Sequence, residues 1–101
     1  MDLPTDRIAD LCRRHSIRRL ALYGSILTDD FGPDNDVDML VEFEPGKTPG
    51  LDFFEIQRNL AEMVGRPVDL NTPRDLSRYF REEVLAEAST IYVSNGVIAM
   101  D

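Results

Sequence analysis

Leu22-Tyr23-Gly24-Ser25, ten further residues and then Asp36-Val37-Asp38 form the stretch of sequence that decides the fold. The apolar run that ends at Tyr23 predicts a buried strand, and we expect a short helix to begin at Ser25. A glycine lets the backbone approach a phosphate closely, and a helix N-terminus offers unpaired N–H donors. A Gly-Ser pair occurs in many turns, so its meaning depends on the residues around it.

The two aspartates stand at the start of a second predicted strand, because apolar and polar residues alternate from Val37 to Phe43. Residues two apart in a strand face the same side and lie roughly 6.6–6.8 Å apart, so we expect Asp36 and Asp38 to project together. Carboxylates, phosphate and water are the ligands that Mg²⁺ prefers. The pair can hold one or two cations, although most Asp-x-Asp pairs on a strand edge are only solvated.

A third acid, Asp69, lies in a short predicted strand from Val68 to Leu70. If that strand pairs beside the Val37–Phe43 strand, Asp69 faces the same cleft. It would then polarise an incoming hydroxyl, either as a general base or as a ligand of a second metal ion. Asp69 alone is more often a strand-end acid or a cap. The joint arrangement favours Asp36, Asp38 and Asp69 as catalytic residues and metal ligands.

The rest of the chain predicts helices alternating with strands. Thr5 is the expected N-cap of the first helix, and a second helix runs from Leu51 to Val64 with Gly65 as its C-cap. A third helix is expected from an N-cap at Thr72 to Ala88, with a break near Ser77. The tail from Ile91 to Ala99 resembles a hairpin around Asn95-Gly96.

This order predicts an α/β (α+β) fold with a mixed sheet and helices mainly on one face. The length of 101 residues predicts a single domain over residues 1–101, with a core of about 5–93 and a tail or hairpin at 94–101. The net charge of −8 argues against a general nucleic-acid surface. Neither a signal peptide nor a membrane span is evident, which predicts a cytoplasmic protein.

Several residues that can carry chemistry have a plainer expected role. Cys12 is the only cysteine, which excludes a disulfide framework and predicts a small buried side chain. We expect His15 to be a helix cap or core residue rather than a catalyst. Solvated loop acids are expected at Asp29, Asp30 and Asp34, and core aromatic residues at Phe53, Phe54 and Phe80.

The quoted motifs resemble those of the minimal nucleotidyltransferases, the MNT branch of the DNA polymerase β-like superfamily. The resemblance extends from the first predicted helix to about Tyr92. Its specific parts are Leu22–Ser25, the strand from Asp36 to Phe43, and Pro67–Leu70. Gly-Ser, ten residues and Asp-x-Asp is the signature spacing of that family.

The resemblance implies a nucleotidyltransferase fold and Mg²⁺-dependent transfer of a nucleoside monophosphate from ATP or another NTP to a hydroxyl. By position, it implies that Asp36, Asp38 and Asp69 hold two metal ions and that Gly24 and Ser25 hold the triphosphate. Many stand-alone members are antitoxins of a HEPN ribonuclease toxin, and some adenylylate a tyrosine of that partner. A HEPN-type toxin is therefore the implied partner.

One segment departs from the family pattern. Relatives commonly carry a small residue, Arg and Gly shortly after the Gly-Ser pair, whereas this chain reads Ile26-Leu27-Thr28-Asp29-Asp30. The cations that can compensate are Lys47, Arg58, Arg66 and Arg74. This departure leaves open a second function, an antitoxin that neutralises its toxin by binding alone. Transfer to a small molecule is less favoured, because the chain has no second domain to form such a pocket.

Overall fold

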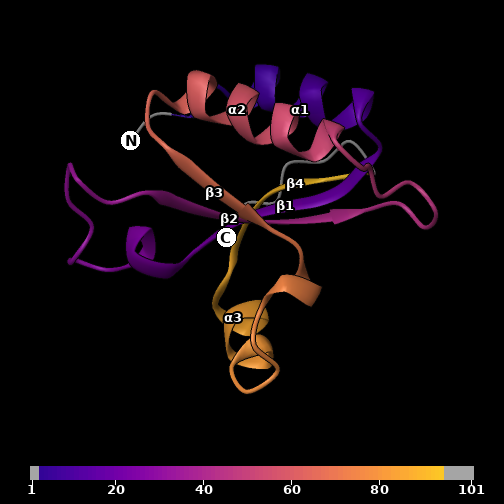
Figure 1. The fold of residues 1–101 in the computed structure, drawn as a ribbon. Coiled ribbons are helices and arrows are strands. Elements are labelled where there is room, and N and C mark those ends of the chain that lie inside the picture. The colour runs from indigo at the N-terminus through magenta and orange to yellow at the C-terminus, as the bar shows by residue number, and fades with distance from the viewer. Residues whose placement is uncertain (1–2, 95–101) are drawn as a thin grey trace.

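The computed structural model describes residues 3–94 and shows helices and strands along one sheet (Figure 1). In chain order the elements are α1 (Thr5–Arg14), β1 (Ile17–Tyr23), the 3₁₀ helix η1 (Gly24–Leu27), β2 (Val37–Phe43), α2 (Asp52–Val64), β3 (Val68–Asn71), the 3₁₀ helix η2 (Pro73–Asp75), α3 (Arg81–Glu87) and β4 (Ser89–Val93).

The four strands form one mixed sheet in the order β3-β2-β1-β4. β1 pairs antiparallel with both β2 and β4, whereas β2 and β3 are parallel. Parallel neighbours need a long crossover, and α2 supplies it. The mixed sheet predicted from the sequence is therefore confirmed, including the pairing of β3 beside β2.

One face of the sheet is covered by α1 and α2, which lie side by side above it in Figure 1. Apolar residues at helical spacing line the inner face of each helix, and every second residue of β2 points toward them. This main core contains Ile8, Leu11, Cys12, Leu20, Leu22, Val37, Met39, Val41, Ile56, Leu60 and Tyr92 among its buried residues. The helices thus lie mainly on one face, as expected.

The opposite face carries a smaller apolar cluster and α3, which lies below the sheet in Figure 1. Ala21 and Leu40 are its buried strand residues, and Leu76 closes it from the η2–α3 connection. Tyr23, Val84, Leu85 and Ala88 pack around them. This face is only partly covered, and polar side chains flank the cluster at both ends of the strands.

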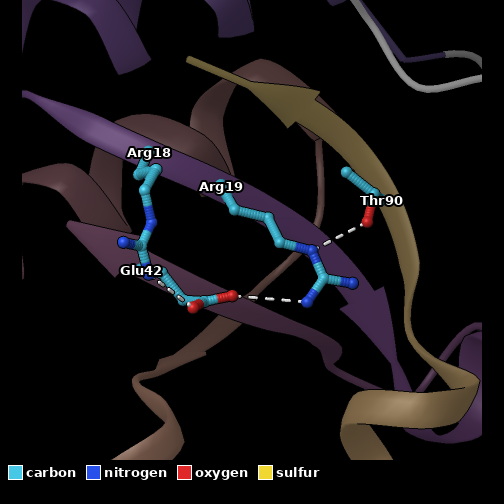
Figure 2. A network of polar contacts seen from close by, with 4 residues as sticks. All are labelled: Arg18, Arg19, Glu42 and Thr90. Atoms are coloured by element: carbon cyan, nitrogen blue, oxygen red, sulfur yellow. Dashed lines mark hydrogen bonds and ion pairs between the residues drawn. The ribbon is translucent and has the colours of Figure 1, made fainter. Parts of the chain in front are cut away.

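At one of these ends, Arg18 and Arg19 share the carboxylate of Glu42 (Figure 2). The nitrogen-to-oxygen distances are 3.1 Å from Arg18 and 3.3 Å from Arg19. Arg19 also donates from Nε to Thr90 Oγ1 at 2.8 Å, so the network joins β2, β1 and β4. Glu42 is therefore fully compensated by positive charge.

One helix prediction is corrected and a second is refined. Thr5 was expected as an N-cap, but α1 already begins at Thr5 and its N-cap is Pro4. The proline ring cannot accept a hydrogen bond from the first turn of the helix. The third helix was expected from an N-cap at Thr72 to Ala88 with a break near Ser77, and that break is present. The interruption is wider than a single residue, because η2 ends at Asp75, Leu76 is extended, and α3 starts only at Arg81. Burial of Leu76 in the smaller cluster explains the interruption.

The aromatic predictions are confirmed only in part. Phe53 packs against the main core, with its ring centroid 6.3 Å from that of Phe43. Phe54 and Phe80 were expected in the core, but 65% and 49% of these residues are exposed. Both stand at the start of a helix, where neighbouring residues provide little cover. Cys12 is completely buried, as predicted, and His15 is the C-cap of α1.

No helix within residues 3–94 has the length and apolar character needed to cross a lipid bilayer. The predicted strand after α3 is present as β4, which ends at Val93. The hairpin expected around Asn95-Gly96 lies outside the residues that the structure describes.

Candidate functional site

Three residues stand in register across three strands at the other polar end of the partly covered face. Tyr23 of β1 is the partner of Asp38 on β2, and Asp38 is the partner of Asp69 on β3. Register partners on adjacent strands point to the same face of a sheet, and adjacent strands lie about 4.7–4.9 Å apart. The fold therefore brings Asp38 and Asp69 together, as the sequence predicted.

Asp38 is half-buried in this row, whereas Asp36 and Asp69 are exposed. Partial burial raises the pKa of the Asp38 carboxyl, and the neighbouring charges of Asp69 and Asp36 raise it further. Asp36 lies one residue before β2, yet it is near enough for its charge to act on Asp38. All three acids contribute negative potential to one place.

These carboxylates differ from Glu42, which lies on the same face of β2. Within residues 3–94, neither Asp38 nor Asp69 forms an ion pair with a basic side chain. Neighbouring carboxylates repel one another, and a cation relieves that repulsion. The donor chemistry thus fits a hard divalent cation, although no cluster of three metal-ligating side chains is already assembled in the described part of the chain.

Gly24 connects the phosphate-binding half of the motif to the carboxylate half. Its φ of +78° lies in the left-handed region, which residues other than glycine rarely adopt. A Cβ at this position would stand 2.5 Å from Asp38 Oδ2. Both the backbone conformation and the lack of space therefore favour glycine at this position, and the turn that precedes Ser25 lies directly against the Asp38 carboxylate.

The short helix expected from Ser25 is a single 3₁₀ turn that includes Gly24. Thr28 closes it, because its backbone N–H and its hydroxyl both donate to the Ser25 carbonyl, at 2.9 and 2.8 Å. Ser25 is half-buried at this turn. The two residues predicted to hold a triphosphate therefore lie at the end of β1, beside the acid row.

The loop that leads to Asp36 is fastened by Arg66. The guanidinium donates to the carbonyl oxygens of Gly32 and Asn35, the latter at 3.0 Å, and lies 4.2 Å from the centroid of the Phe31 ring. Asn35 adds a bond from the Gly32 N–H to its Oδ1 at 2.8 Å. Arg66 was a candidate for the missing cation, but the structure uses it to hold this loop.

Tyr23 and Asn71 extend the site beyond the residues that sequence reasoning identified. Asn71 Nδ2 donates to the Tyr23 hydroxyl at 3.0 Å, and this bond connects the two strands that flank β2. Burial raises the pKa of Tyr23, the bond from Asn71 lowers it, and the charges of Asp38, Asp69 and Asp75 raise it. The only sequence signal was the position of Tyr23 directly before Gly24.

Two hollows flank the acid row. One has a volume of about 670 Å³, lies between η1 and α3, and includes Tyr23 and Gly24 in its wall. The other, about 650 Å³, lies beside Asp69 and includes Phe53 and Phe54. Among residues 3–94, no Lys or Arg lines either hollow. Neither hollow thus contains a basic side chain from the described residues that would replace the missing arginine of the Ile26–Asp30 segment.

The chain matches known nucleotidyltransferases in sequence and in fold. The family model described as polymerase beta, nucleotidyltransferase matches residues 6–96. Protein adenylyltransferase MntA of Thermococcus cleftensis is 33% identical over 85 residues, which are 83% of this chain and 82% of that protein. A solved structure described as a candidate minimal nucleotidyltransferase is 36% identical, with a TM-score of 0.69, and covers 83% of this chain and 85% of that one.

A third similarity is to a Shewanella oneidensis complex, a tri-AMPylated HEPN toxin with its MNT antitoxin. The matched chain has a TM-score of 0.62 and 19% identity, and the alignment covers 90% of this chain and 71% of that one. At this identity the similarity establishes a shared fold.

Proposed function

The chain belongs to the polymerase beta nucleotidyltransferase family, and we propose that it transfers AMP from ATP to a hydroxyl of a partner protein in a Mg²⁺-dependent reaction. The observation that carries this proposal is the register of Asp38 with Asp69, directly beside the Gly24 turn. This arrangement supports the proposal, because the acids that would act on a hydroxyl lie next to the turn that would accept a phosphate chain.

Asp36, Asp38 and Asp69 are the residues that would hold Mg²⁺. When bound, Mg²⁺ would stabilise the charge on the attacking and leaving oxygens of an in-line phosphoryl transfer. The three acids have no basic partner in the described chain, so a cation would offset their mutual repulsion.

The remaining roles follow from position. Gly24 and Ser25 would hold the triphosphate through the backbone of the η1 turn. Asp69, exposed on the edge strand, would orient the acceptor hydroxyl and take its proton. A bond forms between the acceptor oxygen and the α-phosphorus. The bond between the α-phosphorus and the oxygen that joins it to the β-phosphorus breaks, and pyrophosphate leaves.

The proposed partner is a HEPN-type toxin, which would make this chain the antitoxin of the pair. The names of two similar proteins support this: one is protein adenylyltransferase MntA, and the other is an MNT antitoxin bound to an AMPylated HEPN toxin. ATP and Mg²⁺ are both abundant in the cytoplasm, the location expected from the sequence.

Intact-mass measurement tests the proposal. The chain is mixed with the product of its neighbouring gene, ATP and Mg²⁺, and the partner is expected to gain the mass of one AMP for each modified hydroxyl. The double variant Asp36→Asn, Asp38→Asn should abolish this gain. A matched variant, Asp29→Asn and Asp34→Asn, removes two exposed loop charges and should retain it.

A second function, neutralisation by binding alone, is favoured by one observation. The two hollows beside the acids lack basic lining residues within residues 3–94, and the chain has a net charge of −8. Such a chain could mask a basic toxin without holding a nucleotide. A stable complex with the partner, no gain in mass and no binding of ATP would favour this function.

A further inference from the structure

The hollow of about 670 Å³ between η1 and α3 is lined in part by exposed apolar side chains. Leu27 and Phe80 are 42% and 49% exposed, and both line the hollow together with Val84. Exposed apolar side chains that surround a concavity commonly mark a binding site. The hollow is thus suited to a flat apolar group.

Two hydrogen bonds fix the chain segment from which Phe80 projects into this wall. Its own N–H donates to the Ser77 carbonyl at 3.2 Å, and Arg81 Nη2 donates to the Leu76 carbonyl at 3.0 Å. These bonds fix the turn between Leu76 and α3. A braced segment therefore presents the aromatic ring at the hollow, and about half of Phe80 stays exposed.

Two carboxylates complete the wall. Glu83 and Glu87 are four residues apart on α3, so they lie on the same side of that helix and both line the hollow. An ionised carboxylate accepts hydrogen bonds and donates none. With no Lys or Arg among the described lining residues, the hollow disfavours phosphate and favours a neutral ring that carries N–H donors.

We propose that this hollow holds the base of the nucleotide and that Glu83 and Glu87 select a base with an exocyclic amino group, such as adenine. The proposal rests on the proposed function, which places the triphosphate at Gly24 and Ser25. Gly24 is shared between that turn and the wall of the hollow. A nucleotide held there by its phosphates can therefore reach the hollow with its base, where Phe80 and Leu27 contact the ring and a carboxylate accepts from the amino group.

Calorimetric titration of the full chain with ATP and with ITP, both with Mg²⁺, tests the proposal. ITP replaces the amino group of adenine by an oxo group, whose lone pairs would face and repel a carboxylate. The one N–H donor of that edge moves from the exocyclic position to ring N1. We expect ATP to bind about tenfold more tightly than ITP, the scale of a hydrogen bond to a charged group. The ratio of the two Kd values cancels any repulsion between the phosphates and the glutamates.

Three variants identify the residues responsible. In the double variant Glu83→Gln, Glu87→Gln the ratio should fall toward one, because an amide can donate to the oxo group of ITP. Phe80→Ala should raise the Kd of both nucleotides by about tenfold, which is the lower end of the range for stacking of a base on an aromatic ring. Phe54→Ala is the control, since Phe54 is also exposed but lines the other hollow, and it should leave both Kd values unchanged.

The outcomes separate this inference from the proposed function. A chain that binds neither nucleotide would overturn both. If ATP and ITP bind with equal affinity and Phe80→Ala changes neither Kd, the base site alone is overturned. The hollow would then be free to accept a basic side chain of a protein partner. A Phe80→Ala effect combined with an unchanged ATP-to-ITP ratio in the glutamine variant would overturn the role of the carboxylates. Far-ultraviolet circular dichroism confirms that each variant is folded.

Discussion

Gly24 lies so close to Asp38 that a Cβ on residue 24 would be 2.5 Å from Asp38 Oδ2. The two residues come from different parts of the signature, and β1–β2 pairing brings them together through the partnership of Tyr23 with Asp38. The backbone that is proposed to face phosphate and the carboxylate that is proposed to hold a cation are thus fixed relative to each other.

We predict that Gly24→Ala will lower both stability and AMP transfer. The methyl group must displace the Asp38 carboxylate, and alanine at a φ of +78° costs about 1–2 kcal/mol in addition. Urea unfolding measures the stability loss, and intact mass of the partner measures transfer. Gly46→Ala is the matched control, because Gly46 has a φ of +76° and no atom within 4 Å of an added Cβ. A Gly24→Ala chain that behaves like Gly46→Ala would contradict the steric argument.

Replacing Asp38 by Asn should separate stability from function. Burial and the charges of Asp69 and Asp36 raise the pKa of Asp38, so its ionised form is disfavoured in the folded protein. Without divalent cations, the variant should unfold at the same temperature as the parent or a higher one near pH 7. Mg²⁺ with ATP should raise the Tm of the parent but not that of the variant. Thermal unfolding with and without Mg²⁺ checks both expectations, and Asp34→Asn serves as an exposed control.

Arg66→Ala should loosen the loop before Asp36. The variant loses two hydrogen bonds to backbone carbonyls and the contact with the Phe31 ring, which together correspond to about 1–3 kcal/mol. Urea unfolding should show this loss, and limited proteolysis should cut between residues 28 and 36 more rapidly. Arg58→Ala, an exposed position on α2, should change neither measurement. Equal effects of the two variants would contradict the role of Arg66 in holding the loop before Asp36.

Cys12 should be inert in the folded protein. Burial raises the pKa of its thiol to about 12, with Arg13 lowering it slightly, so the reactive thiolate is scarce at pH 8. Ellman's reagent should react only after denaturant is added. Because the folded pKa lies above the ordinary value of 9.0, the stability that Cys12 contributes is complete below pH 9 and declines as the pH rises toward 12. The difference in unfolding free energy between the parent and Cys12→Ala should follow that decline.

Local pattern was sufficient for most of the elements. Alternation predicted β2 with its observed bounds, and helical spacing with Gly65 as a left-handed cap predicted α2 to within one residue. The smaller cluster explains why the predicted break near Ser77 extends over residues 76–80: Leu76 belongs to a helical stripe in the sequence but is extended in the fold, where it is buried against Ala21 and Leu40. A contact between residues far apart in the chain overrode the local preference.

The sequence by itself predicted the family and the mixed sheet, and it singled out three acids as candidates, because a spacing of fixed residue types is a local property. Only the tertiary structure decided that Asp38 and Asp69 are register partners, that Gly24 lies against Asp38, and that Arg66 holds a loop instead of facing a nucleotide. It also turned Phe80 outward toward a hollow with Glu83 and Glu87. These relationships depend on strand pairing and on the packing of α3 against the sheet, and residues distant in sequence meet only when the chain folds.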